Sequence, residues 1–154
     1  MEKEIRFYHL QRSTIDEALP LLVEKAYARG HRLQLLFAGK ERAQHIDQLL
    51  WTYQAHSFLP HGIEGKDTPE NQPIWLTTQS ENANNANTLM VVDDIELLPA
   101  TKAAVDFSLI CRIFHGENPE SLAMARFLWQ QWKKDSTWQL SYWQQEDSGW
   151  QKKQ

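Results

Sequence analysis

Residues 5–38, IRFYHLQRSTIDEALPLLVEKAYARGHRLQLLFA, decide the fold that the sequence predicts. They begin with a short run of residues that favour strands, Ile5 to Leu10. Thr14 follows after a short gap, and its hydroxyl can cap a helix in a reciprocal pair with Glu17. We therefore expect a strand that leads directly into a helix.

This helix is expected over about residues 15–29, because apolar side chains recur there at helical spacing. Gly30 is placed to end it, since glycine readily adopts the left-handed conformation of a helix stop. The next run, Leu33 to Ala38, is apolar enough for a strand that is buried on both faces. Together the three segments predict a β-α-β unit.

The remaining patterns extend this unit without a visible domain boundary. Two more helices are expected. The first covers Glu41–Trp51, and the second begins after the capping residue Asn118, with Pro119 at its first position, and runs to about Lys134. Four further strands are expected at Ile74–Thr78, Thr88–Val92, Phe107–Phe114 and Trp138–Trp143. This alternation predicts an α/β sandwich with a mostly parallel sheet. We expect one domain over residues 1–154, with 144–154 as a loose tail.

Composition argues against several classes of protein. The chain has 16 Lys and Arg against 20 Asp and Glu, which does not suit a protein that coats nucleic acid by bulk electrostatics. Cys111 is the only cysteine, and the six histidines show no metal-ligand spacing, so no disulfide framework and no metal site is predicted. A charged N-terminus and the lack of a long apolar run predict a soluble, cytoplasmic protein without a membrane span.

Motifs for catalysis and cofactor binding are missing or incomplete. Residues 34–41 fail as a phosphate-binding loop, because Gln and Glu stand where glycine and a hydroxyl are required. Residues 10–13 lack the glycines of a dinucleotide-binding turn. Asp93 and Asp94 follow an apolar strand, as magnesium ligands do in nucleotide hydrolases, which leaves a nucleotide-binding α/β domain as an alternative. No catalytic residue and no cofactor is predicted.

Tryptophan is concentrated near the end of the chain. Five of the seven tryptophans are Trp129, Trp132, Trp138, Trp143 and Trp150. We weigh Trp132 and Trp138 equally as core residues and as binding residues, and stacking of single-stranded nucleic acid on these rings is a further alternative.

The last helix places Arg126, Trp129 and Lys133 within roughly 60° of one another on its flank. An arginine beside an aromatic ring suits a peptide that ends in an aromatic residue with a free carboxylate, because guanidinium binds carboxylate through two parallel hydrogen bonds. Lys133 and Lys134 would attract acidic residues upstream of that terminus.

The segment Leu50–Gly62, LWTYQAHSFLPHG, together with Phe7-Tyr8-His9-Leu10, strongly resembles the chi subunit of the bacterial DNA polymerase III clamp-loader complex. The resemblance extends from Phe7 to Trp143. It implies a Rossmann-like three-layer fold with no nucleotide-binding loop and no enzymatic activity. It further implies a replisome adaptor that links the clamp loader to single-stranded DNA-binding protein by gripping its acidic C-terminal tail. No direct DNA binding is expected.

The resemblance also assigns roles to individual residues. Arg126 matches the tail-binding arginine of the family and Trp129 the aromatic residue three places later, with Lys133 and Lys134 completing the predicted tail site. Where some members carry lysines, this chain has Leu122 and Gln130. Trp51 and Phe58 match the aromatic pair that faces the psi subunit or, alternatively, a helicase.

Overall fold

The computed structural model describes residues 3–53, 59–101 and 106–154. Its helices are α1 (Ile15–Ala28), α2 (Lys40–Thr52) and α4 (Pro119–Lys133). Its strands are β1 (Lys3–Leu10), β2 (Leu33–Leu36), β3 (Gly62–Ile63), β4 (Ile74–Thr77), β5 (Thr88–Val91), β6 (Leu109–His115), β7 (Trp138–Glu146) and β8 (Gly149–Lys152).

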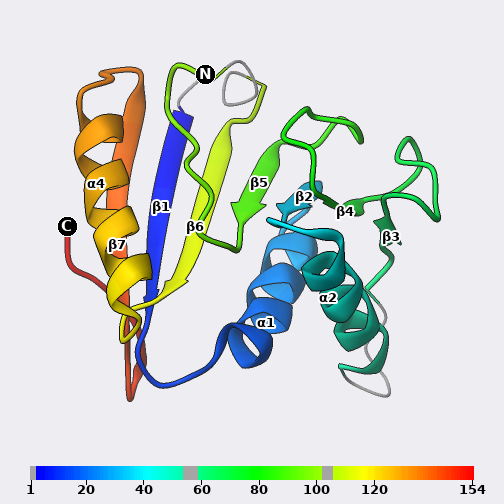
Figure 1. The fold of residues 1–154 in the computed structure, drawn as a ribbon, viewed down its shortest axis with the longest axis horizontal. Coiled ribbons are helices and arrows are strands. Elements are labelled where there is room, and N and C mark those ends of the chain that lie inside the picture. Colours follow the sequence, from blue (N-terminus) through cyan, green and yellow to red (C-terminus); the bar gives the residue numbers. More distant parts are fainter. Residues whose placement is uncertain (1–2, 54–58, 102–105) are drawn as a thin grey trace.

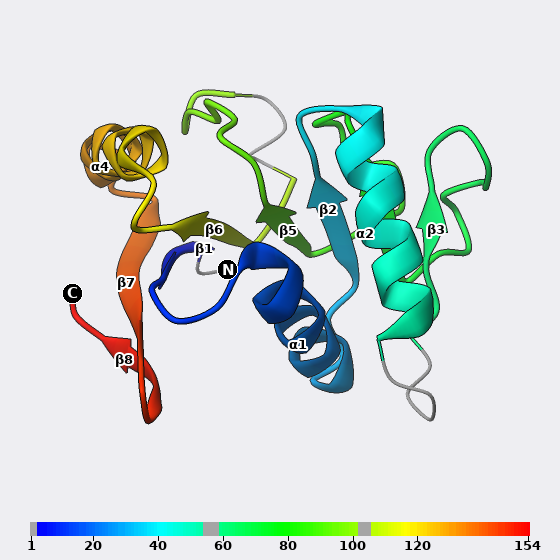
Figure 2. The same cartoon turned by 60° about the horizontal axis from the view of Figure 1, so that its bottom comes forward.

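One sheet joins all of these strands, in the order β3-β4-β2-β5-β6-β1-β7-β8 (Figure 1). Every neighbouring pair is parallel except β7 and β8, which are antiparallel. Helices α1 and α2 lie on one face and α4 on the other (Figure 2). The predicted α/β sandwich with a mostly parallel sheet is confirmed.

Local capping signals explain where the helices begin and end. The Thr14 hydroxyl accepts from the Glu17 amide at 3.2 Å, and the Glu17 carboxylate accepts from the Thr14 amide at 3.0 Å. Gly30 adopts φ +89° just after Arg29, the C-cap of α1. At the start of α4, the Asn118 side chain accepts from the two backbone amides that follow Pro119. The predicted caps are therefore present, and the observed helix ends lie within a residue or two of the expected ones.

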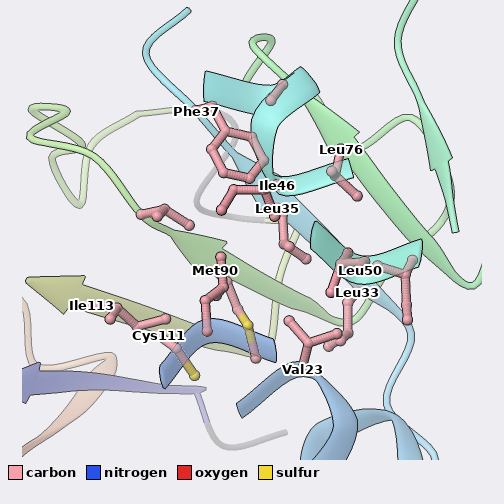
Figure 3. Packing of buried hydrophobic residues seen from close by; sticks show 14 of the residues in the cluster. Val23, Leu33, Leu35, Phe37, Ile46, Leu50, Leu76, Met90, Cys111 and Ile113 are labelled. Carbon is pink, nitrogen blue, oxygen red and sulfur yellow. The ribbon is translucent and has the colours of Figure 1, made fainter. Parts of the chain in front are cut away.

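Two apolar cores fill the space between the layers. One lies under α1 and α2 and includes Val23, Leu35, Met90 and Cys111 (Figure 3). The other lies under α4 and includes Phe7, Phe107 and Trp132. The sheet is thus buried from both sides over its central strands, and all four residues of β2 are buried, including Gln34, as the prediction of a strand buried on both faces requires.

The end of the chain differs from the expectation. Residues 144–154, predicted to be loose, instead extend β7 to Glu146 and form β8. Gly149 makes the connecting turn with φ +120°, and Trp150 packs edge-on against Tyr8 with ring centroids 5.0 Å apart. The backbone ladder and this aromatic contact hold the segment in place. A second, smaller difference is β3, a two-residue strand in a stretch expected to be loop.

No helix among the described residues is long and apolar enough to cross a membrane.

The thiol of Cys111 is predicted to be inert in the native protein. It lies in the sheet interior, and burial raises the pKa of the thiol to about 12, so the reactive thiolate is scarce at pH 8. Iodoacetamide at pH 8 is expected to leave the folded protein unmodified and to alkylate one thiol after unfolding in urea. Rapid alkylation of the native protein, followed by mass spectrometry, would contradict this burial.

Candidate functional site

A hollow of about 600 Å³ lies between α4, β7 and the residues that follow β8. We call it the α4 pocket. Its lining comes from four parts of the chain: Leu122, Arg126, Trp129, Gln130 and Lys133 of α4, His9 of β1, Tyr142 and Gln144 of β7, and Lys153 and Gln154. The C-terminus accordingly lies beside α4 and β7 (Figure 1).

Aromatic rings fix the position of Trp129 in this pocket. Its ring packs edge-on against Phe7 at 5.3 Å and against Tyr142 at 5.7 Å between centroids. The Tyr142 hydroxyl lies 2.6 Å from Nδ1 of His9, which in turn contacts Phe114. Because these partners belong to three neighbouring strands, the half-buried ring of Trp129 is firmly held as one wall of the pocket. The Tyr142 hydroxyl and the His9 imidazole provide polar groups beside it.

The charges around the pocket are positive. Arg126 is exposed and makes no ion pair with any carboxylate in the described part of the chain. Burial, together with the charge of Arg126, lowers the pKa of His9, so this imidazole is neutral at pH 7. Lys133 is exposed, and Lys153 pairs with Glu146 at 3.1 Å. No side chain among the described residues lining the pocket carries a carboxylate, so the arrangement suits an anionic ligand.

The predicted tail residues are thus only partly brought together. Arg126, Trp129 and Lys133 line the α4 pocket, whereas Lys134 caps the end of the helix and does not line it. Sequence reasoning missed Lys153, because the strand that carries the chain back to the pocket was expected to be a loose tail. The turn-forming Asp-Ser-Gly at 147–149 was the available signal for a hairpin.

The second predicted surface is only half described. Trp51 lies in the last turn of α2 with 51% of its area exposed, and its ring contacts that of His61 at 4.6 Å. His61 is buried, hydrogen-bonds the Leu59 carbonyl at 2.7 Å and lies 3.0 Å from a carboxylate oxygen of Asp47. Phe58 lies outside the described residues, so its place beside Trp51 stays a prediction.

The acidic pair considered as magnesium ligands is engaged in structural contacts. Asp93 accepts hydrogen bonds from the backbone amide of Ala38 at 2.8 Å and from Arg42 at 3.3 Å. Asp94 accepts from the hydroxyl of Ser121 at 2.8 Å. These carboxylates therefore tie the strand ends to neighbouring loops and to α4, which supports the structural interpretation over nucleotide binding.

Gln145 occupies the position at which phosphate binds in nucleotide-binding members of such folds. Its side-chain oxygen accepts from the backbone amides of Gln11, Arg12 and Ser13 at 3.1, 2.8 and 3.0 Å. These amides form the turn between β1 and the helix that follows, where a dinucleotide-binding domain places its glycine-rich loop. The three amide donors of this turn are therefore already hydrogen-bonded to a side chain of the protein itself.

Loss of the Gln145 side chain is expected to destabilise the protein. Gln145→Ala removes one acceptor from three amides and should lower the free energy of unfolding by about 1 to 2 kcal/mol, less than three full hydrogen bonds because water reaches the turn. Urea denaturation followed by circular dichroism measures it. Gln139→Ala, an exposed position on the same strand, is the control and should change stability by less than about 0.5 kcal/mol. Equal effects of the two substitutions would contradict the role of Gln145.

The tryptophans near the C-terminus do not form one platform. Trp132 and Trp138 are 1% and 7% exposed and meet edge-on at 4.9 Å, so both belong to the core under α4. Trp129 lines the α4 pocket, whereas Trp143 and Trp150 pack against Tyr8 on the opposite face of the sheet. This separation disfavours a continuous stacking surface for single-stranded nucleic acid.

Fold and site together define a Rossmann-like α/β domain without a nucleotide-binding loop. The family model described as "DNA polymerase III chi subunit, HolC" matches residues 1–138, and the chain belongs to this family. The description of this family names a subunit of DNA polymerase III.

Two similar proteins were found, one by its sequence and one by its fold. The probable DNA polymerase III subunit chi of Rickettsia prowazekii (strain Madrid E) is 27% identical over 95 residues, which span 62% of this chain and 58% of that protein. The C-terminal domain of Dbp5 from S. cerevisiae superposes with a TM-score of 0.55 at 10% identity, covering 92% of this chain and 90% of that one. The second similarity concerns the fold alone.

Proposed function

We propose that this protein is a non-catalytic replisome adaptor that binds the acidic C-terminal tail of single-stranded DNA-binding protein in the α4 pocket. By holding that tail, it links the DNA polymerase III clamp loader to coated template. The observation that carries the proposal is the guanidinium of Arg126, which no described carboxylate pairs with, beside the fixed ring of Trp129 in a pocket whose described lining has no acidic side chain.

The chemistry of the pocket suits a peptide that ends in an aromatic residue. The terminal carboxylate would pair with Arg126 through two hydrogen bonds, and the aromatic side chain would rest on Trp129. Acidic residues further upstream would be attracted by Lys133 and Lys134. Leu122 and Gln130 line the same pocket as uncharged residues, and Lys153 on the opposite wall is paired with Glu146, so Arg126 and Lys133 are the cations that the proposal relies on within the pocket.

A free terminal carboxylate is expected to be required for binding. In fluorescence anisotropy, a labelled acidic peptide ending in Pro-Phe should bind the protein, and its C-terminally amidated form should bind roughly tenfold or more weakly, because one charge-assisted pair is lost. The two peptides differ only at the terminus, so the rest of the acidic sequence is controlled. Equal affinities would place the recognition elsewhere in the peptide and would contradict the proposed clamp.

For the second surface we propose contact with another protein component. Trp51 and Phe58 would face the psi subunit of the clamp loader or, alternatively, a helicase. The exposed ring of Trp51, seated on the buried and anchored His61, supports this role, because a rigid exposed aromatic side chain is typical of an interface anchor. We further propose that residues 1–154 act as one domain.

A further inference from the structure

A second hollow, of about 220 Å³, lies on the face of the sheet opposite to the α4 pocket. We call it the α1 groove. It runs between α1 and the β7–β8 hairpin, which extend to the same side of the sheet, away from α4 (Figure 2). The lining of the α1 groove shares no residue with the α4 pocket and does not include Trp51.

The floor of the α1 groove is apolar. Met90, Cys111 and Ile113, seen together in Figure 3, continue from the core into the groove. Leu22 and Ala26 of α1 form one wall. Such a floor favours an aliphatic or aromatic group, because removing apolar surface from water is favourable.

The opposite wall is a packed aromatic cluster. Tyr8 stacks on Trp143 with ring centroids 6.4 Å apart and planes inclined by 25°, and Trp150 meets Tyr8 edge-on at 5.0 Å. The indole of Trp143 donates to the hydroxyl of Ser141 at 2.9 Å. The wall is therefore already ordered, so a ligand that packs on it does not need to immobilise these side chains.

One end of the groove is strongly cationic. Lys25, Arg29 and Arg6 line it, and no acidic side chain does so in the described part of the chain. Arg6 pairs with Glu4 at 2.8 Å, but Lys25 and Arg29 make no ion pair with any described carboxylate. Burial and then the charges of Arg6 and Arg29 lower the pKa of His31, which shows that these cations act on one small region.

From this combination we infer that the α1 groove binds an acidic peptide segment of a partner protein, with one large apolar side chain in the groove and neighbouring carboxylates on Lys25 and Arg29. Charge complementarity favours this occupant, since the chain as a whole has a net charge of −4 and yet gathers unpaired cations here. A volume of about 220 Å³ admits a single bulky side chain.

A nucleic-acid base fits the groove less well. The neutral polar groups of the lining are already engaged, the Tyr8 hydroxyl with Arg6 at 3.3 Å and the Thr88 hydroxyl with His31 at 2.9 Å. A base buried against Leu22 and Ala26 would leave its polar edges without partners, which costs free energy that an apolar side chain does not pay.

The test uses nitrogen-15 labelled full-length protein and a peptide that cannot use the α4 pocket clamp. The probe is Asp-Glu-Trp-Glu-Asp, acetylated and amidated so that it has no free terminal carboxylate. We expect saturable shifts of the Trp143 and Trp150 indole signals and of amides around Arg29. The same peptide with serine in place of tryptophan should shift these signals far less, because the groove is then not filled.

Variants separate this groove from the tail site. Lys25→Glu combined with Arg29→Glu, both at exposed positions, should weaken binding of the probe peptide at least roughly fivefold. Lys66→Glu, which lies outside the groove lining, and Arg126→Ala should leave the affinity for the probe unchanged. A loss of probe binding in Arg126→Ala alone would assign the peptide to the α4 pocket. Absence of groove shifts at millimolar peptide, equal shifts with the serine peptide, or stronger groove shifts with oligothymidine would each overturn the inference.

Discussion

Replacing Arg126 by alanine is expected to weaken binding of the acidic tail peptide by about 1.5 to 3 kcal/mol, which is a factor of roughly 10 to 150 in Kd. The guanidinium is the charged group placed beside Trp129, and no described carboxylate competes for it. The substitution removes a side chain that is largely in water in the free protein, so the fold should be unaffected and the loss should appear only in binding.

Two further variants give this measurement its controls. Arg126→Lys retains the charge but not the two parallel hydrogen bonds, and an intermediate affinity is expected. Lys66→Ala removes an exposed cation that does not line the α4 pocket, and it should change Kd less than roughly threefold. The titration is by fluorescence anisotropy at fixed ionic strength. If Arg126→Ala binds the peptide as tightly as the unaltered protein, the tail site is elsewhere.

Local signals explain why the helices and most strands were predictable. The Thr14 and Glu17 pair, Gly30 and Asn118 each determine a helix end through contacts within a few residues. Such contacts are encoded by spacing alone, so they can be recognised without knowledge of the tertiary structure. The flank formed by Arg126, Trp129 and Lys133 was predictable for the same reason, since it follows from helical periodicity.

The opposite wall of the α4 pocket depends on contacts between distant residues. His9 and Tyr142 approach within 2.6 Å because β1 and β7 are neighbours in parallel register, which spacing along the chain does not reveal. Lys153 reaches the pocket only through the β7–β8 hairpin. Gln145, a polar residue in a segment expected to be loose, likewise finds its three amide partners more than 130 residues away in the sequence.

The tryptophans show the same limit within one helix. Helical periodicity places both Trp129 and Trp132 on the apolar side of α4, so it does not separate them. The structure does, because Trp132 is fully enclosed by the core whereas Trp129 is at its edge beside β7. Which ring becomes buried is decided by the strand and loop that pack against the helix, not by the helix itself.

Replacing Trp132 by alanine should therefore have the largest effect on stability, lowering the free energy of unfolding by about 3 to 5 kcal/mol. The side chain is 1% exposed, packs edge-on against Trp138 at 4.9 Å, and donates from its indole to the Leu97 carbonyl at 2.9 Å. Removing it leaves a large cavity and a buried carbonyl without its donor. Urea unfolding followed by far-ultraviolet circular dichroism measures the change.

Two variants on the same helix separate the causes of this loss. Phe127→Ala removes an aromatic side chain that is 46% exposed, so it should cost less than about 1 kcal/mol. Trp132→Phe keeps most of the apolar volume but loses the hydrogen bond to Leu97, and a loss of about 1 to 2 kcal/mol is expected. A cost for Trp132→Ala no larger than for Phe127→Ala would mean that Trp132 does not hold α4 on the sheet. Because Arg126 and Trp129 are carried by that helix, the position of the α4 pocket would then need another explanation.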